Sequence, residues 1–145
     1  MKSCCLRLLC CLFLVVSIGM AGCLEKKQGK VMISHQEFIL RKDSDHSYAI
    51  DAKGRIKNVG EVDVKNIVVT GYCRSCGEVM IAKKWFVGAE KMPEQKDTIS
   101  RLTAGGETEF HFKGVADLYS EKGAPAPALP DQLEAVVESF ETADN

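Results

Sequence analysis

The sequence predicts an all-β fold, a sandwich of antiparallel sheets, and two observations support it. Apolar and charged residues alternate from Tyr48 to Lys57, which is the two-residue period of a half-buried strand. Short β-branched or aromatic runs then follow one another, separated by turn residues at near-regular intervals. Such spacing is typical of two antiparallel sheets packed face to face.

The elements before and after this central strand follow from the same pattern. Apolar clusters at 31–33 and 38–40 predict an edge strand with a break between them, and the charged stretch 41–46 predicts a loop. After the central strand, residues 58–61 have turn composition.

A second β-branched run begins at Val62. Its apolar parity changes between Val64 and Ile67, which predicts a β-bulge at Lys65 and Asn66 that re-aims the strand.

Downstream of this run the elements are shorter. In order, we expect a turn at 73–77, a strand at 79–82 that pairs back across it, a further strand at 85–87, a polar loop at 88–98, and a strand with Phe110 and Phe112 on one face.

The C-terminal segment allows two interpretations. Residues 122–130 are a Pro/Ala loop of extended character. After it, Leu133, Val136, Val137 and Phe140 fall on one helical face, yet 136–141 is also a good closing strand. We favour the strand, because a sandwich needs a last strand and tertiary pairing overrides a short amphipathic pattern.

The N-terminus has the features of a secretory signal. Lys2 and Arg7 precede an apolar run, and small residues follow it. Residues 20–23, Met-Ala-Gly-Cys, resemble the lipobox of bacterial lipoproteins, with Met20 where that family usually has Leu. The resemblance implies cleavage before Cys23 and its lipidation, and divides the chain into a signal peptide (1–22), a lipidated tether (23–30) and a folded domain (31–145).

The alternative is that 8–24 remains as an uncleaved membrane anchor, although seventeen uncharged residues are at the lower limit for spanning a bilayer. With cleavage, the first four cysteines of the chain leave with the signal. The protein is then held outside the cytoplasm by its lipid. Leu24, rather than Asp, follows the anchor cysteine. By resemblance to lipoproteins of double-membraned bacteria, this implies the periplasmic face of the outer membrane.

A second resemblance concerns the folded domain. The segment 54–60, the Val-rich strand that ends at Tyr72, and the later Leu102, Gly105 and Phe110 resemble the immunoglobulin-like FxLYD-type domains of bacterial surface proteins. Of the signature strand Phe-x-Leu-Tyr-Asp, only Tyr72 is present here. The resemblance implies an immunoglobulin-like sandwich and no catalytic residues.

Cys73 and Cys76 form the one motif that could carry chemistry. Outside the cytoplasm, a Cys-x-x-Cys pair at a tight turn predicts a disulfide that staples a hairpin. A zinc or copper site needs further ligands, and the three histidines of the chain, at positions 35, 46 and 111, follow no ligand spacing. A thioredoxin-like pair needs its first cysteine at a helix start, whereas a β-branched run precedes Cys73.

Trp85 and Phe86 are a second candidate site. Adjacent side chains of a strand point to opposite faces, so one ring is expected in the core and the other outside. Trp85 is the candidate core aromatic, and the outward ring is a candidate for a partner-binding patch.

No enzyme motif is present in the sequence: it has no nucleophile elbow, no phosphate-binding glycine loop and no zinc-protease motif. The formal charge of −1 comes from mixed acidic and basic residues, so nucleic acid is not an expected partner. We expect a lipid-anchored, non-catalytic module, without a cofactor, that binds another envelope protein. The rival hypothesis is a metal-handling or thiol-redox lipoprotein centred on Cys73 and Cys76.

Overall fold

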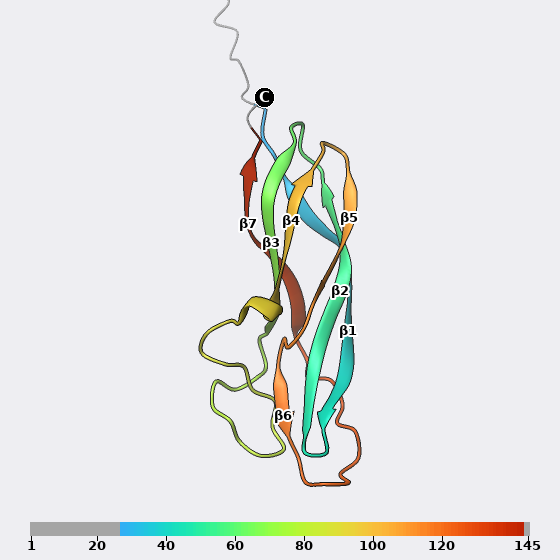
Figure 1. Ribbon diagram of the computed structural model, residues 1–145, viewed down its shortest axis with the longest axis vertical. Helices are drawn as coiled ribbons and strands as arrows, with labels where there is room; N and C mark the ends of the chain where they lie inside the picture. Colours follow the sequence, from blue (N-terminus) through green and yellow to red (C-terminus); the bar gives the residue numbers. More distant parts are fainter. Residues whose placement is uncertain (1–26, 144–145) are drawn as a thin grey trace, which may run out of the picture.

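The computed structural model describes residues 27–143, and its strands form two antiparallel sheets packed face to face (Figure 1). The predicted all-β sandwich is therefore confirmed. The first sheet contains β1 (Val31–Ser44), β2 (Ser47–Asn58), β5 (Glu107–Phe112) and β6 (Asp117–Tyr119). The second contains β4 (Lys96–Leu102), β3 (Val64–Cys73) and β7 (Leu133–Thr142), and a short 3-10 helix, η1 (Pro93–Gln95), precedes β4.

Strand β2 is the centre of the first sheet, as its alternation predicts. It pairs with β1 on one edge and with β5 and β6 on the other. Tyr48, Ile50, Ala52 and Ile56 are buried, whereas Lys53 is exposed. From Ala52 to Asn58 the sequence period therefore gives one core face and one solvent face, whereas Ala49 and Asp51 are buried as well, so both faces of the first half of β2 are covered.

The core lies between the sheets and receives side chains from both. Phe110 and Phe112 of β5 are buried, and their rings stack with centroids 5.7 Å apart. They pack with Ile56 of β2 and with Ile67 and Val69 of β3. All five are almost completely removed from water, so this cluster is the main apolar contribution to folding.

Gly54 is required where β1 and Phe110 approach the middle of β2. A Cβ atom at this position would lie 2.1 Å from the backbone oxygen of His35 and 2.7 Å from the Phe110 ring. The register of β1 shifts between Ile33 and His35, next to this contact. The predicted break in the first strand is thus a bulge inside one continuous strand.

The predicted bulge at Lys65 and Asn66 is confirmed. Asn66 has a φ of 51°, and the pairing of β3 with β7 is irregular between Lys65 and Val68. Asparagine tolerates this left-handed conformation better than most residues. The bulge lets Val64 and Ile67, which have opposite parity, both face the core.

Three sequence predictions on local structure have clear outcomes. Residues 133–142 form a strand, as favoured over the helix. The expected loop at 41–46 is wrong in its first part, because β1 continues to Ser44 and Arg41 donates a 2.8 Å hydrogen bond to Asp51 of the neighbouring strand. The expected strands at 79–82 and 85–87 are wrong, because both segments lie in a long loop between β3 and η1.

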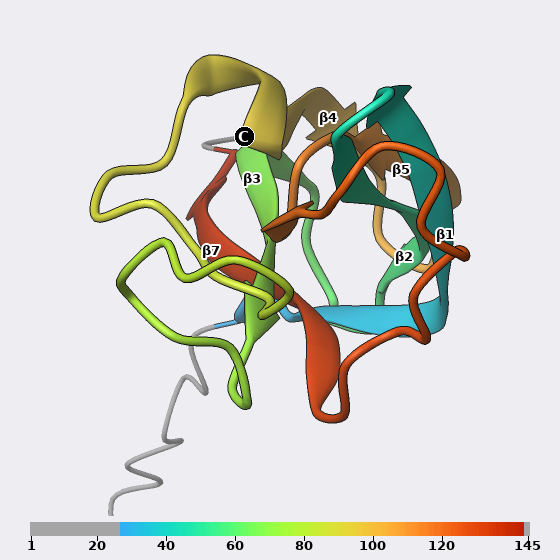
Figure 2. The same ribbon diagram turned by 90° about the horizontal axis from the view of Figure 1, so that it is seen from below.

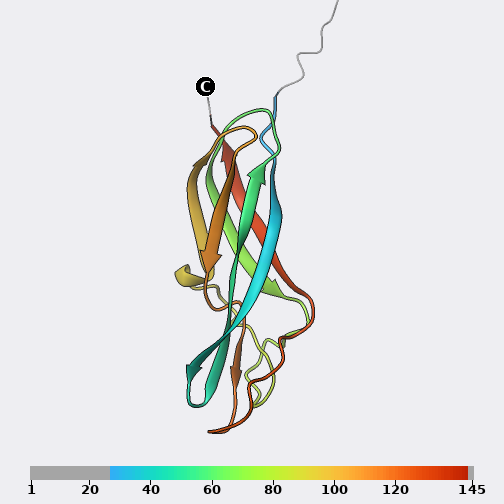
Figure 3. The ribbon, with the colours of Figure 1, turned by 90° about the vertical axis from the view of Figure 1, so that its right-hand side faces the viewer.

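The described chain begins and ends at the same end of the sandwich (Figures 1 and 3). Lys30 accepts a hydrogen bond from Val59, and Gln28 accepts one from Glu61, so residues 28–30 run along the turn after β2. At the other terminus, Ala143 donates to Asp63. The predicted signal peptide (1–22) and Cys23 lie outside the described residues.

Candidate functional site

The candidate site lies at the end of the sandwich opposite the point where the described chain begins (Figure 1). Two long segments without strands or α-helices meet there, residues 74–92 and residues 120–132. We call these two segments the tip loops. Seen from below in Figure 2, the first lies beside β3 and the second passes β1 before it enters β7.

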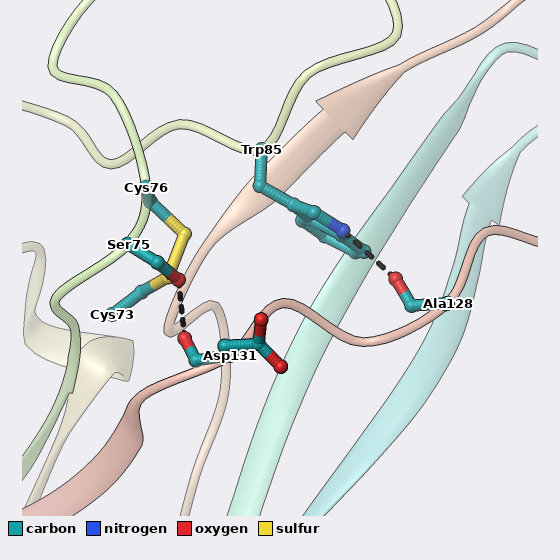
Figure 4. The surroundings of a disulfide bond; sticks show 6 residues. All are labelled: Cys73, Ser75, Cys76, Trp85, Ala128 and Asp131. Carbon is teal, nitrogen blue, oxygen red and sulfur yellow. Dashed lines mark hydrogen bonds between the residues drawn. A yellow bond between two sulfur atoms is a disulfide. The ribbon is translucent and has the colours of Figure 1, made fainter.

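Cys73 and Cys76 lie where the first tip loop leaves β3 (Figure 4). Their sulfur atoms are at disulfide-bonding distance and their Cα atoms are 5.4 Å apart. The sequence analysis predicted that this pair closes a hairpin, which is wrong, because no strand follows directly after β3. The pair instead fixes the end of β3 to the start of the first tip loop. Cys73 is only 8% exposed.

The same region ties the two tip loops together. The Ser75 hydroxyl donates to the backbone oxygen of Asp131 (Figure 4), and the Arg74 backbone N–H donates to Gln132 over 3.0 Å. The two residues between the cysteines are therefore bonded to the segment that leads into β7. A disulfide in this place restricts both loops at their common base.

Trp85 lies in the first tip loop, half-buried and in contact with the core. Its indole Nε1–H donates a 3.0 Å hydrogen bond to the backbone oxygen of Ala128 in the second tip loop (Figure 4). Its backbone oxygen accepts from Gly77 over 3.0 Å, and Gly77 accepts from Val87 over 2.9 Å. Trp85 thus joins the core, its own loop and the Pro/Ala segment.

Phe86 is also half-buried, so the expected division into one inner and one outer ring does not apply. The backbone of Phe86 exchanges two 2.9 Å hydrogen bonds with Asp117 of β6. Its ring stacks on Tyr119, with centroids 5.7 Å apart, and Tyr119 is itself 45% exposed. The two aromatic residues predicted as a partner-binding patch therefore lie at the base of the tip loops.

The most exposed apolar residues of the tip are ones that the sequence analysis assigned to a strand. Val79, Met80 and Ile81 are consecutive and are 69%, 62% and 50% exposed. Three adjacent large apolar side chains with this exposure are unfavourable in water. The available signal was an apolar run next to Gly77 without the two-residue period of a half-buried strand.

Two hollows lie at the tip, and the smaller one borders this run. The smaller, about 270 Å³, is lined by residues from both tip loops, including Val79, Ile81, Trp85 and Pro130. The larger, about 400 Å³, lies between the end of β6 and the Pro/Ala segment, against Leu118. Both are open to solvent and more apolar than polar.

Charged groups at the tip are held in local contacts. Lys83 pairs with Glu121 over 2.8 Å, and this hydrogen bond lowers the pKa of the Glu121 carboxyl. The Lys91 ammonium lies 4.5 Å from the centre of the Tyr72 ring and donates to the backbone oxygen of Gly71. Burial lowers the pKa of Lys91, since its charge is partly removed from water.

Asp117 is the titratable group where β6 meets the first tip loop. Burial raises the pKa of its carboxyl, and the negative charge of Asp43 raises it further, while Arg41 acts in the opposite direction. Its backbone, not its carboxylate, makes the bonds to Phe86. The ionised form of Asp117 is therefore disfavoured at the boundary between the first sheet and the tip loops.

The histidines do not gather at the cysteine pair. His35 and His111 border a hollow of about 820 Å³ on the outer face of the first sheet, and His46 lies at the turn between β1 and β2. Cross-strand pairs occupy that face, Lys53 with Glu37 at 3.2 Å and Arg55 with Glu109 at 3.8 Å. Within residues 27–143 no group of three or more His, Cys, Asp or Glu has the geometry of a metal site.

In the same described range, the structure has no helix long and apolar enough to cross a bilayer. Comparisons of the chain with protein-family models, with curated proteins and with solved structures gave no match.

Proposed function

We propose that this chain is a lipid-anchored, non-catalytic protein of the cell envelope whose immunoglobulin-like module binds another envelope protein through its tip loops. The lipid is attached at Cys23 after cleavage of the signal peptide 1–22. The anchor holds the domain at the membrane outside the cytoplasm, on the periplasmic face of the outer membrane where the host has two membranes.

The strand order supports the immunoglobulin-like assignment. In that fold, strands A, B and E lie in one sheet, and strands C and F lie together in the other. Taken in chain order, β1, β2 and β5 match A, B and E, while β3 and β7 match C and F. β4 pairs with the edge of β3 that β7 does not occupy. Variable-type domains add a further strand at the same place, beside strand C.

The observation that carries the proposal is the exposed run from Val79 to Ile81. It lies at the far end of the domain from Lys27, where the described chain begins (Figures 1 and 3). A tether attached near Lys27 would leave this run facing away from the anchoring membrane. Interface cores are formed by such apolar side chains surrounded by polar residues.

The state of the cysteine pair also supports a binding module rather than a thiol-redox protein. A redox cysteine must expose its thiolate to another protein. The near-complete burial of Cys73 instead suits a structural bond. Mass spectrometry of the mature protein before and after reduction tests the disulfide against the metal-handling rival: a disulfide predicts a gain of two hydrogens on reduction, whereas bound metal in the native spectrum would favour that rival.

Lipidation is tested on the full chain in cells. The variant Cys23→Ala should accumulate as a longer precursor that takes up no labelled palmitate. The variant Cys73→Ser is the matched control and should be processed and labelled like the wild type. Labelled palmitate on Cys23→Ala would contradict the anchor.

Partner binding is tested by photo-crosslinking in intact membranes. A photoreactive residue in place of Met80 should give a discrete protein adduct on irradiation. The matched control places it at Met32, which is 47% exposed but lies on β1, away from the tip. Equal adducts from both positions, or none from Met80, would overturn the proposal.

A further inference from the structure

The second tip loop contains an extended proline-rich segment that Trp85 holds in place. Between Ala124 and Pro130, every residue except Ala128 is a proline or directly precedes one. Proline fixes its own φ, and the residue before it is biased toward extended backbone, so this segment is restrained to polyproline-type conformations. The structure has neither helix nor strand there.

The contact between the indole and this segment has the chemistry of proline-rich peptide recognition. Trp85 Nε1–H donates to the backbone oxygen of Ala128 over 3.0 Å (Figure 4). Grooves that bind polyproline helices use aromatic side chains in this way, because such helices leave their carbonyl groups unpaired. Trp85 therefore already holds one proline-rich segment, residues 124–130 of the same chain.

A hollow lies beside this contact. Val79, Ile81, Trp85 and Pro130 are among the residues that line it, and its volume is about 270 Å³. These four side chains supply apolar surface, and Ser75, Lys83 and Lys84 add a hydroxyl and two ammonium groups to the lining. The dimensions suit one or two proline rings, which bury apolar surface with little loss of conformational entropy.

We propose that this hollow binds an extended, proline-rich segment of the partner protein, alongside the chain's own residues 124–130. The inference rests on the proposed function and names the partner's chemistry at the same surface. The chain's segment would form one side of the site, and Ile81 would contact the incoming prolines.

Trp85 makes the test direct, because it is the single tryptophan of the chain. The full-length protein in detergent is titrated with a synthetic peptide containing two copies of the sequence of residues 124–130. We expect a saturable change in indole emission and a matching calorimetric isotherm. A control peptide with serine in place of every proline should bind at least about tenfold more weakly.

Two variants complete the experiment. Ile81→Asp should weaken binding of the proline peptide at least about tenfold, since it places a charge in the apolar wall. Met32→Asp, on β1, should bind as the wild type does. Absence of a saturable signal by both methods, equal binding of the serine peptide, or unchanged binding by Ile81→Asp would overturn the inference.

The crosslinking experiment separates this inference from the proposed function. A discrete adduct at Met80 together with no binding of the proline peptide would overturn the proline-rich partner alone. Absence of an adduct from the photoreactive residue at Met80, with no other substitution, would count against the proposed function, whether or not the proline peptide binds.

Discussion

The sandwich and the tip loops use apolar residues in opposite ways. In the sandwich, Ile56 and Phe110 are buried between the sheets and pair across strands in regular register. At the tip, Val79 and Met80 are exposed to water, and the loops are held by one cysteine pair, by backbone bonds and by a few side-chain bonds such as that of Trp85. The comparison indicates that the sandwich supplies stability, while the tip leaves apolar surface in water, and it is this surface that the proposed function assigns to a partner.

The largest expected effect comes from the sandwich. Ile56→Ala removes a completely buried side chain and should lower the free energy of unfolding by roughly 2–5 kcal/mol. Urea unfolding of the domain measures the loss, with an unchanged m-value. Met32→Ala, at an exposed position, is the control; a loss at Ile56 no larger than this control would contradict the placement of the core.

The cysteine pair should matter less. Cys73→Ser with Cys76→Ser opens a very short loop, for which the chain-entropy model gives about 1–2 kcal/mol. The domain should stay folded, and hydrogen exchange should rise in the tip loops rather than in β2. A double variant that unfolds as readily as Ile56→Ala would show that the pair supports the whole sandwich.

The two regions also differ in how far the sequence predicts their secondary structure. The period of residues 48–57 predicted β2, and the parity change at Asn66 predicted the bulge, because one face of each strand is buried. The run at 79–82 has strand propensity, but β3, the strand before it, has no free edge for it to join. Both edges of β3 are already paired, with β4 and β7, so the expected hairpin has no place in the sheet.

The same pairing explains β7 and the missed β6. The second edge of β3 is filled by 133–142, which is why a segment with a helical apolar pattern becomes a strand. Strand β6 has only three residues, too few to show a period. Of the candidate site, Cys73, Cys76, Trp85 and Phe86 were found from residue type, whereas the exposure of Val79 to Ile81 depends on tertiary pairing.

At the boundary of the two regions, Asp117→Asn should stabilise the domain at neutral pH. The folded state raises the pKa of Asp117 above its ordinary 3.8, so it favours the protonated form and loses stability as pH rises through the folded-state pKa. The gain should stay below about 1 kcal/mol, because solvent screens a half-exposed carboxylate. It should vanish near pH 3, and unfolding at both pH values measures it; an equal gain at both would exclude titration as the cause.

The smallest expected effect is that of Trp85→Phe. It keeps an aromatic ring and removes the indole donor to Ala128, an exposed carbonyl that water can satisfy, so the cost should be about 0.5 kcal/mol. Hydrogen exchange should increase within residues 120–132. Unchanged exchange there would mean that the indole bond does not hold the Pro/Ala segment.

The central claim is that the tip is a binding surface supported by a fold that does not need it. Ile81→Asp tests this when stability and photo-crosslinking from Met80 are measured on the same full-length variant. The expected result is an unfolding free energy within about 0.5 kcal/mol of the wild type together with loss of the adduct. A loss of stability as large as that of Ile56→Ala, or an adduct that persists, would contradict the claim.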